Sequence, residues 1–508
     1  MPIKKLSELC AAIPECRLLG DDVDIVDIVY DSRKVVPGSL FVALVGAKSD
    51  GHDYIPEATS KGAAALAITT DTGGWYGAKG LPVIVMPDTR GALPKLAATF
   101  FDEPSRNLFL VGVTGTNGKT STSTMIDSIF RIIGDRTGLI GTLGATVNGK
   151  AQNLDRTTPE SPDLQRLFAQ MIEQGVRRVV MEVSSEGALA GRTSECAFDI
   201  GVFTNLTQDH LNTHGTMEAY FQQKLRLFTE YPDAFPDKPF SAVVNADDPY
   251  GLRIIDAVEA AGLQVLQFSM RDENAPLYAE VHEARPNGTN FTIHYQPPQG
   301  SRIRIPIELR IGGLFSVANA LAAAGAGLLA KLPTSAVKNG LELLAGVPGR
   351  FELVDTENRG FDVVVDYAHS PDGLENVLSS ARELHPKRLV CVFGCGGDRD
   401  KNKRPKMGKI AVDIADLVIV TSDNPRTENP DMIVKDILAG IPEGAGNPKV
   451  LVEVDRRAAI QMAICEVVEA GDLIVIAGKG HETTQQIGDQ KFPFDDRVVA
   501  REVLAECA

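Results

Sequence analysis

Short apolar runs alternate with longer segments of helical period through the middle of the chain. The apolar runs predict strands that begin at residue 108 and that span 177–183, 198–204 and 240–245. The segments of helical period predict helices at 120–133, 217–228 and 317–329. This alternation implies a mostly parallel sheet with helices on both faces. Ligands of such a sheet bind at the carboxyl ends of its strands.

The last third of the chain repeats the alternation, and each of its strands ends in polar and glycine residues. Strands are predicted at 363–366, 389–393, 417–420 and 473–477. The polar segments at their ends are 366–369, 394–399, 421–426 and 477–482. Any single one of these segments is explained by a tight turn. Four of them at one edge of a sheet predict a ligand site.

The first hundred residues carry shorter β-like runs separated by turns. The clearest is a strand at 40–45, followed by a polar loop that contains glycine. That loop fits a ligand-binding loop and a surface hairpin equally well. A polar stretch with a proline at 101–106 marks the end of this region. Because a domain takes about 100–200 residues, the 508 residues predict three α/β domains, at 1–107, 108–345 and 346–508.

Composition excludes some classes of protein. The formal net charge of −16 argues against a nucleic-acid partner, because binding to phosphates along a nucleic acid needs a basic face. The N-terminus has no apolar run after its lysines, and no stretch approaches the ~18 apolar residues that span a bilayer. The seven cysteines are scattered, so we expect reduced thiols and a cytoplasmic protein without membrane contact. We also expect a monomer.

The most informative motif is the turn between the strand from 108 and the next helix, Thr-Gly-Thr-Asn-Gly-Lys-Thr at 114–120. Its glycines let backbone N–H groups converge on an anion, and the helix N-terminus adds a positive dipole. Lys119 supplies a mobile positive charge, and Thr120 a hydroxyl that can ligate magnesium. The common phosphate-binding pattern has glycine at the position of Val113. A plain corner needs neither Lys119 nor Thr120, so we interpret the turn as a nucleoside triphosphate site.

Polar residues also follow two other strands of the middle region. They are Glu182, Ser184 and Ser185 after one strand, and Asn205, Asp209 and His210 after the other. With Thr120, the side chains of Glu182 and His210 would make a magnesium site of hard oxygen ligands and one imidazole. Taken alone, His210 is equally well explained as a capping or packing histidine.

Together these motifs resemble those of the Mur ligases, bacterial enzymes that add amino acids to the UDP-N-acetylmuramoyl peptide precursor of the cell wall. The resemblance spans essentially the whole chain, through the segments 114–120, 182–185, 205–210, 366–369 and 423–426. The phosphate turn alone does not separate this family from the folylpolyglutamate ligases. The segments Asp31-Ser-Arg33 and Asp423-Asn-Pro-Arg426 do.

The resemblance implies an ATP-dependent amide ligase. Its N-terminal α/β domain would bind the UDP precursor, its central ATPase-like domain ATP, and its Rossmann-like C-terminal domain the amino acid. The precursor would be UDP-N-acetylmuramoyl-L-alanyl-D-glutamate and the amino acid meso-2,6-diaminopimelate, joined through an acyl phosphate with Mg²⁺ as cofactor.

The resemblance also assigns individual residues. The UDP precursor would be held by Ser32, Ala47, Lys48, Ser49, Thr157, Thr158, Ser184 and Arg192. ATP would be held by Gly115, Thr116, Asn117, Gly118, Lys119, Thr120, Ser121, Asn319 and Arg350. Diaminopimelate would be held by Arg399, Asp423, Asn424, Pro425, Arg426, Gly478 and Glu482. Arg426 would pair with the distal carboxylate through two parallel hydrogen bonds, although an arginine after Pro425 could instead cap a turn, which we consider the less favoured explanation.

Lys224 matches the lysine that reacts with carbon dioxide to give a carbamate in this family. By pattern alone it is a solvated lysine on a helix. As a carbamate it would join Thr120, Glu182 and His210 around the magnesium ion. The resemblance thus implies a catalytic set of Lys119, Lys224, His210 and Glu182.

Two positions depart from the family pattern. Glu186 stands where a histidine usually follows the double serine, and Ala190 stands where a glutamine is common. These changes bear on local contacts to the precursor rather than on the reaction. Three alternatives stay open: a lysine-adding or folate-acting ligase, a P-loop switch or motor, and a pure binding module. A switch would be expected to carry a guanine-reading Asn-Lys-x-Asp motif, which the sequence lacks.

Overall fold

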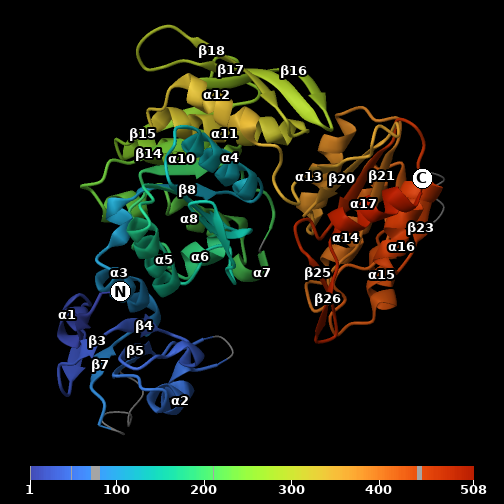
Figure 1. Ribbon diagram of the computed structural model, residues 1–508. Coiled ribbons are helices and arrows are strands. Elements are labelled where there is room, and N and C mark those ends of the chain that lie inside the picture. The colour runs from blue at the N-terminus through green and yellow to red at the C-terminus, as the bar shows by residue number, and fades with distance from the viewer. Residues whose placement is uncertain (1, 47–48, 70–79, 210, 443–448, 508) are drawn as a thin grey trace.

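The computed structural model describes residues 2–46, 49–69, 80–209, 211–442 and 449–507, arranged as three α/β bodies in chain order (Figure 1). Each body is built around its own sheet. The predicted fold class, with mostly parallel sheets, is confirmed. The domain boundaries after residues 107 and 345 stay predictions.

The N-terminal body contains a small sheet with the strand order β2-β7-β6-β5-β4, in which only the edge strand β2 is antiparallel. Its strands are β2 Arg17–Leu19, β4 Asp27–Val29, β5 Ser39–Val42, β6 Ala65–Thr69 and β7 Val83–Met86, and β1 Lys4–Lys5 pairs with β3 Asp24–Ile25. Its helices are α1 Leu6–Ala11, α2 Ile55–Ser60 and α3 Thr89–Phe100, with short 3₁₀ turns η1 Ser32–Lys34, η2 Gly51–Tyr54 and η3 Pro104–Asn107. The strand predicted at 40–45 is β5, which ends three residues earlier.

The central body contains a long sheet with the order β11-β10-β9-β12-β8-β13-β14-β15-β16-β17-β18 in the described chain. Strands β9 to β16 along that order are parallel, and antiparallel strands extend both edges. The strands are β8 Phe109–Thr114, β9 Thr137–Gly141, β10 Gly144–Val147, β11 Lys150–Gln152, β12 Arg178–Glu182, β13 Ile200–Phe203, β14 Ser241–Asn245, β15 Gln264–Ser269, β16 Leu277–Arg285, β17 Gly288–Tyr295 and β18 Ile303–Leu309. The antiparallel part, β16 to β18, was not predicted from the sequence.

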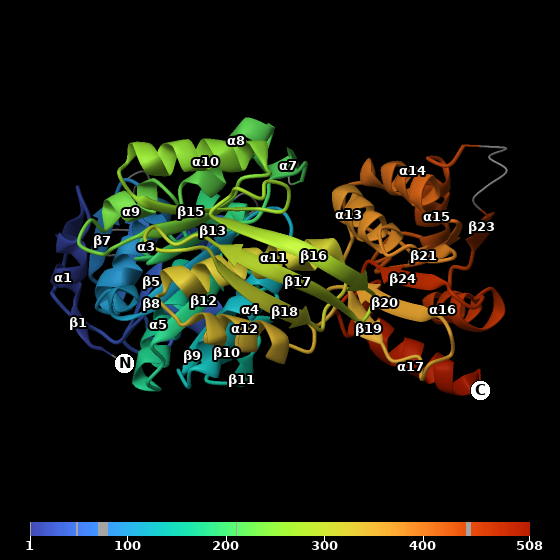
Figure 2. The same cartoon turned by 90° about the horizontal axis from the view of Figure 1, so that it is seen from above.

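Helices cover both faces of the parallel part of this sheet, as Figure 2 shows from above. Alternate residues of a strand point to opposite faces, so Val111 and Val113 of β8 enter one core while Leu110 enters the other. The first core is closed by α4 Lys119–Ile132, α11 Leu314–Leu329 and α12 Thr334–Leu343. The second core is closed mainly by α5 Ser161–Glu173, α8 Met217–Leu225 and α10 Pro249–Ala260. The helices predicted at 120–133, 217–228 and 317–329 are confirmed as α4, α8 and α11.

Short helices complete the central body. They are α6 Ser185–Leu189, α7 Leu211–His214 and α9 Glu230–Ala234.

The C-terminal body contains a sheet with the order β19-β20-β24-β21-β22-β23 in the described residues, parallel except for the edge strand β19. Its strands are β19 Glu352–Val354, β20 Asp362–Asp366, β21 Leu389–Phe393, β22 Leu417–Val420, β23 Lys449–Val452 and β24 Leu473–Ala477. One face is covered by α13 Pro371–Arg382, α14 Lys403–Ile414 and α15 Pro430–Leu438, the other by α16 Arg456–Gln461, the π-helical turn η4 Met462–Glu466 and α17 Asp496–Glu506. The four strands predicted in this part of the chain are confirmed.

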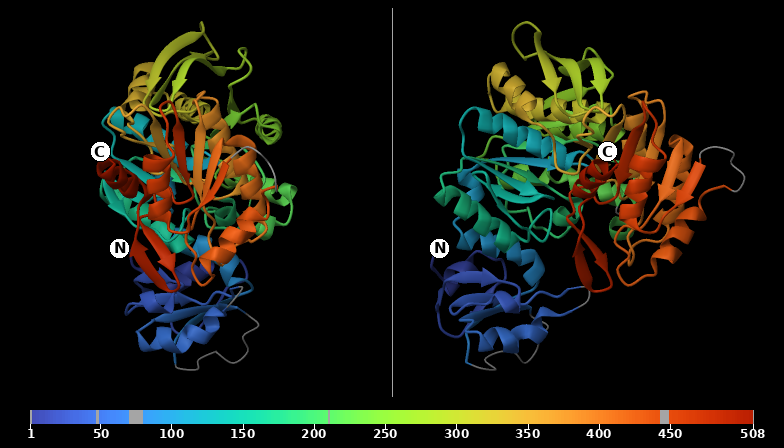
Figure 3. Two further views of the ribbon diagram at one scale, coloured as in Figure 1. Left: turned by 90° about the vertical axis from the view of Figure 1, so that its right-hand side faces the viewer. Right: turned by 45° about the vertical axis from the view of Figure 1, so that its right-hand side comes forward.

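A two-stranded hairpin, β25 Thr484–Ile487 and β26 Gln490–Pro493, projects from this body toward the level of the N-terminal body (Figure 3). In the described part of the chain, no helix is long and apolar enough to cross a bilayer.

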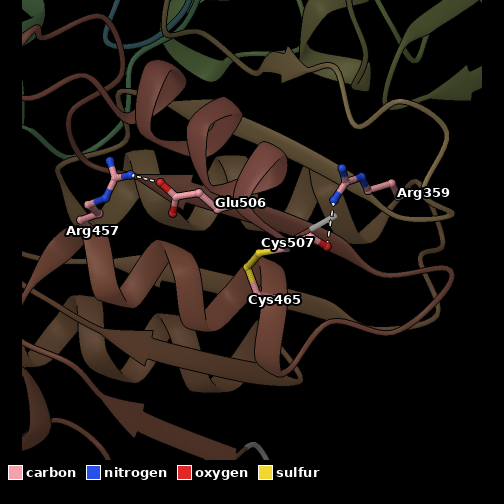
Figure 4. The surroundings of a disulfide bond; sticks show 5 residues. All are labelled: Arg359, Arg457, Cys465, Glu506 and Cys507. Carbon is pink, nitrogen blue, oxygen red and sulfur yellow. Dashed lines mark hydrogen bonds and ion pairs between the residues drawn. A yellow bond between two sulfur atoms is a disulfide. The ribbon is translucent and has the colours of Figure 1, made fainter.

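The expectation that all thiols are reduced is wrong at one pair. Cys465 of η4 and Cys507, directly after α17, form a disulfide with their Cα atoms 5.8 Å apart (Figure 4). The pairing joins residues 42 positions apart in the sequence, so spacing gave no signal for it. It became visible only because the fold packs the end of α17 against η4.

Candidate functional site

A cavity of about 1240 Å³ is lined by residues of the central and the C-terminal bodies. From the central body it is lined by the phosphate turn at 116–121, the residues after β12 and β13, and Asn319 of α11. From the C-terminal body it is lined by residues that follow β20, β21, β22 and β24. The predicted carboxyl-edge sites of the two sheets therefore open into one shared space. We call this space the interdomain cleft.

The phosphate turn depends on glycine at two positions. Gly115 has φ +150° and Gly118 has φ +83°, values that favour glycine over residues with a Cβ. A Cβ at Gly115 would overlap Thr204 Oγ1, and a Cβ at Gly118 would overlap Asn319 Oδ1. The next residue, Lys119, begins α4, so the positive end of that helix faces the turn. The local geometry fits an anion-binding loop.

Two lysine side chains meet at one carbonyl oxygen of this turn. Lys119 Nζ donates to the carbonyl oxygens of Gly115 at 3.0 Å and Thr116 at 2.8 Å. Lys224 Nζ, from α8, donates to the same Gly115 oxygen at 2.6 Å. The Lys224 side chain is only 2% exposed, so the pattern-based view of a solvated lysine is wrong.

Both lysines have a lowered pKa. Burial lowers the pKa of Lys224 well below its usual value, and the nearby Lys119 ammonium lowers it further. Loss of hydration also lowers the pKa of Lys119, against the opposing effect of the Glu182 carboxylate. Two ammonium groups on one oxygen repel each other, so the arrangement favours a neutral amine at Lys224.

The Glu182 carboxylate is buried at the end of β12 and lines the interdomain cleft. Its Oε1 accepts from the Thr142 backbone N at 2.8 Å and its Oε2 from Thr142 Oγ1 at 3.1 Å. A Cβ at Gly141 would overlap Glu182 Oε1, so glycine at that position leaves room for the carboxylate. Thr120 Oγ1 also lines the cleft and accepts from Arg350 Nη2 at 3.2 Å.

These oxygen donors fit a hard cation such as magnesium, which prefers carboxylate and hydroxyl oxygens. The fourth member of the predicted set, His210, lies outside the described residues. Among the described residues no group of three or more His, Cys, Asp or Glu side chains gathers as a metal site. The predicted metal set thus stays a prediction that depends on Lys224 and His210 as well as on Thr120 and Glu182.

Four of the predicted precursor-binding residues line the cleft, namely Thr157, Thr158, Ser184 and Arg192. Arg192 donates to Glu160 Oε1 at 3.0 Å and to the Thr158 carbonyl at 3.2 Å. Thr158 Oγ1 in turn accepts from the Ser184 backbone N at 3.0 Å. These contacts connect Thr158, Ser184 and Arg192, and Thr158 Oγ1 also donates to the Glu182 carbonyl at 2.9 Å.

The described remainder of the residues predicted to bind the precursor does not lie with this group. Ser32 is buried in the N-terminal body, where its hydroxyl donates to Glu57 Oε2 at 2.7 Å. Ser49 is exposed, and its carbonyl accepts from the Gly46 backbone N at 2.9 Å. Ala47 and Lys48 lie outside the described residues. Neither Ser32 nor Ser49 lines the cleft. Of the two departures from the family pattern, Glu186 does line it, while Ala190 directly follows α6.

The residues predicted to bind diaminopimelate gather at the wall of the cleft that the C-terminal body forms. We call it the amino-acid wall. Arg426 Nη1 donates to the Gly397 carbonyl at 2.7 Å, and its other guanidinium nitrogens make no hydrogen bond with the described residues. Asn424 Nδ2 donates to Glu482 Oε2 at 2.9 Å. Asp423, Arg399 and Gly478 line the same wall, whereas Pro425 does not. Arg399 is exposed.

A buried arginine that sequence reasoning missed holds this wall together. Arg456 is 1% exposed and forms a two-point ion pair with Asp496, through Nε at 2.8 Å and Nη2 at 2.6 Å. It also donates to the carbonyl oxygens of Ser422 at 3.2 Å and Ala477 at 3.0 Å. It therefore joins the ends of β22 and β24. No local pattern distinguishes Arg456 from a surface arginine.

Asp372 was also missed, although it lies only three residues after the segment 366–369. Its Oδ2 accepts from Asn117 Nδ2 at 2.6 Å and from Thr207 Oγ1 at 2.6 Å. Asp372 belongs to α13 of the C-terminal body, whereas its two partners belong to the central body. A carboxylate therefore bridges the two bodies at the phosphate turn.

We expect the Asp372→Ala variant to be more open than the wild type. It loses two hydrogen bonds to a charged group, worth about 1.5–3 kcal/mol each. That loss would shift the equilibrium between domain arrangements by at least about tenfold. Small-angle scattering without ligands should give a larger radius of gyration. Glu383→Ala, at the exposed end of the same helix, should scatter like the wild type. Identical curves for all three proteins would contradict the bridging role.

Three family models match the chain in order. "Mur ligase family, catalytic domain" matches residues 24–101, "Mur ligase middle domain" residues 113–327, and "Mur ligase, glutamate ligase domain" residues 349–480. The matches together follow the order of the three bodies.

Individual relatives match over nearly the full length. A protein of Gloeobacter violaceus named UDP-N-acetylmuramoyl-L-alanyl-D-glutamate–2,6-diaminopimelate ligase is 45% identical over 507 residues, covering 100% of this chain and 99% of that protein. A protein of Bacillus licheniformis with the same name is 45% identical over 487 residues, covering 96% of each chain. A solved structure described by that name has a TM-score of 0.67 at 33% identity, covering 95% of both chains. The chain therefore belongs to the Mur ligase family.

Proposed function

We propose that this chain is an ATP-dependent ligase that joins meso-2,6-diaminopimelate to UDP-N-acetylmuramoyl-L-alanyl-D-glutamate, with release of ADP and phosphate, in peptidoglycan precursor synthesis. One observation carries the proposal. The phosphate turn, the group around Thr158 and Arg192, and the wall with Asn424 and Arg426 all line one cleft. The names of the full-length relatives support the same pair of substrates. A cytoplasmic location and a monomeric state stay predictions.

The reaction needs an activated acid, because an amine does not displace oxygen from a carboxylate. In the first step a carboxylate oxygen of the D-glutamate attacks the γ-phosphorus, the bond to the bridging oxygen breaks, and ADP leaves. In the second step the amine nitrogen attacks the acyl carbon, phosphate leaves, and the nitrogen loses a proton. Two anions must approach each other in the first step, so positive charge at the site sets its rate.

The phosphate turn supplies this positive charge from several sources. The N-terminus of α4 would face the phosphates, with its positive dipole end and its first backbone N–H groups, which have no partner within the helix. Lys119 Nζ, which lies on the turn, would move from its two carbonyl partners to the phosphate oxygens. Mg²⁺, when bound, neutralises negative charge on the γ-phosphate.

Thr120, Glu182, His210 and a carbamate on Lys224 would hold the magnesium ion. A carbamate forms when a neutral amine attacks carbon dioxide and loses a proton. The lowered pKa of Lys224 supports this step, because it increases the neutral fraction of the amine at a given pH. The negative charge of the carbamate would also attract the nearby Lys119 ammonium group.

The wall of the cleft would recognise the distal end of diaminopimelate, which carries both a carboxylate and an ammonium group. Arg426 has guanidinium donors without a partner among the described residues, and these would receive the carboxylate. Glu482 and the Gly478 loop would receive the ammonium group. Lysine has the ammonium group but not the carboxylate.

The test is ADP release with a panel of amino acids and defined UDP precursors. We expect release only when ATP, the dipeptide precursor and meso-diaminopimelate are all present. Release without precursor would favour a motor or switch. Release with a folate in place of the UDP precursor would favour the folate-acting relatives, and an equal rate with L-lysine would favour a lysine-adding enzyme.

A further inference from the structure

Lys479 is a fully buried lysine at the edge of the amino-acid wall, in the loop between β24 and β25. Lysine is rarely buried unless its charge is paired, so the position calls for an explanation. It belongs to none of the residue sets assigned above, and it does not itself line the interdomain cleft. Any effect of Lys479 on the cleft therefore passes through its neighbours.

The ammonium group of Lys479 connects three parts of the wall. Nζ donates to Glu482 Oε2 at 3.1 Å, to Asn424 Oδ1 at 3.3 Å and to the Thr484 carbonyl at 2.7 Å. Asn424 follows β22, Glu482 follows β24, and Thr484 begins the β25–β26 hairpin. All donors of the lysine are used in these contacts.

The two carboxylate oxygens of Glu482 differ in their contacts: one accepts hydrogen bonds, and the other, which we call the open oxygen, accepts none from the described residues. Oε2 accepts both from Lys479 and from Asn424 Nδ2, at 3.1 and 2.9 Å. Oε1 accepts no hydrogen bond from the described residues. Glu482 lines the cleft and its side chain is 33% exposed. The carboxylate is thus held at one oxygen, and the other has no hydrogen-bond partner among the described residues although the residue lines the cleft.

The position of Asn424 is fixed by the same network. Its Oδ1 accepts from Lys479 and from the Gln486 backbone N at 2.8 Å, which leaves its amide nitrogens for Glu482. Arg426, two residues later, is held by the same hairpin, because its backbone N donates to the Gln486 carbonyl at 3.1 Å. Lys479 therefore fixes Asn424 and Glu482 directly, on the ammonium side of the site, whereas Arg426 on the carboxylate side is held by its own backbone bond to the hairpin.

We propose that Lys479 is a positioning residue that sets amino-acid specificity, by fixing Glu482 so that its open oxygen accepts the distal ammonium group of the incoming diamino acid. The inference rests on the proposed function. It also explains why a positive charge is buried here: Glu482 and Asp423 place two carboxylates on one wall, both near enough to Arg456 to influence its pKa. Lys479 balances this charge and selects one orientation of Glu482.

The test is the Lys479→Met variant, which keeps most of the side-chain volume and removes the charge. We expect KM for meso-diaminopimelate to rise about 10- to 100-fold, as for loss of a hydrogen bond to a charged group. KM for ATP and for the UDP precursor should stay within about twofold. Lys491→Met, at an exposed lysine on the β26 strand of the same hairpin, is the matched control and should leave all three values unchanged.

An amino acid without the distal amine, 2-aminopimelate, separates positioning from general structural support. With this analogue, wild type and Lys479→Met should have the same KM, because the group that Glu482 receives is missing. The effects of Lys479→Met and Glu482→Gln should also be non-additive in the double variant. Equal losses with both amino acids, or additive losses, would overturn the proposal.

Folding is checked by thermal unfolding of each variant. If Lys479→Met does not fold, Lys479→Gln keeps an uncharged donor at the site and should show a smaller rise in KM for meso-diaminopimelate alone. An unchanged KM in that variant would also overturn the proposal. Failure of the proposed function is distinguishable, since wild type would then release no ADP in response to meso-diaminopimelate.

Discussion

Replacing Lys224 by alanine is expected to lower kcat by about 10²–10³-fold, the usual effect of removing one preorganised electrostatic group from a reaction centre. Addition of a short carboxylic acid, such as formate or acetate, should restore part of the lost rate. The small acid would occupy the space left by the side chain and supply the carboxylate that the carbamate provides in the wild type.

The reason lies in the environment of the amine. Lys224 Nζ is buried and shares the Gly115 oxygen with Lys119. Its lowered pKa means that the neutral form, which reacts with carbon dioxide, is present at a lower pH than for an ordinary lysine. Carbamylation should therefore increase as the pH rises through this lowered pKa, and be lost on acidification.

Two measurements check this prediction. Intact mass of the wild type, compared at neutral and acid pH, should show the loss of one carbon dioxide, and Lys224→Ala should show none. Gln222→Ala, at an exposed position of the same helix, should keep both the mass change and the activity. Full activity of Lys224→Ala without added acid would contradict the assignment of Lys224 as the carbamylated lysine.

The second large effect concerns selectivity at Arg426. We expect the wild type to prefer meso-diaminopimelate over L-lysine by roughly 10⁴–10⁵-fold in kcat/KM, because lysine would leave a guanidinium without its carboxylate. Replacing Arg426 should lower kcat/KM for meso-diaminopimelate and leave the value for lysine little changed, so that the preference nearly disappears.

The choice of substitution follows from the backbone. Arg426 has φ +52°, in the left-handed region, and its N and O atoms both bond to the β25–β26 hairpin and its turn. Asparagine adopts this conformation more readily than most residues, so Arg426→Asn removes the guanidinium with little backbone cost. Arg426→Lys keeps the charge but not the two-point geometry, and should recover only part of the preference.

The measurement is ADP release with each amino acid over a range of concentrations. Arg501→Asn, an exposed arginine on α17, is the control and should behave as the wild type. A wild-type enzyme that used L-lysine as well as meso-diaminopimelate would show that Arg426 does not have the role given to it.

The sequence predicted the parts of this protein that depend on neighbouring residues. Alternation of apolar runs and helical segments predicted the parallel strands of the central and C-terminal sheets, because strands buried on both faces must be apolar throughout. The glycines of the segment 114–120 predicted the backbone geometry of the turn, and Gly115 and Gly118 have the positive φ values that such a turn needs. The polar residues at strand ends predicted that a ligand site would lie along those edges.

The structure corrected predictions that depend on burial. Lys224 has a helix pattern typical of a surface lysine, yet it is buried against the phosphate turn. The scattered cysteines gave no reason to pair Cys465 with Cys507. In both cases the decisive partner lies far away in the sequence, so no local pattern carries the information.

By itself, then, the sequence determined the strand and helix order, the phosphate turn and the family, because backbone conformation and apolar periodicity are local properties of the chain. Only the tertiary structure decided that the two sheet edges share one cleft, that Asn117 donates a hydrogen bond to Asp372, and that Lys479 donates one to Glu482. In each case the contacting residues belong to different bodies or different loops, which only folding brings together. Their energies depend on distance and burial, which exist only once the chain has folded.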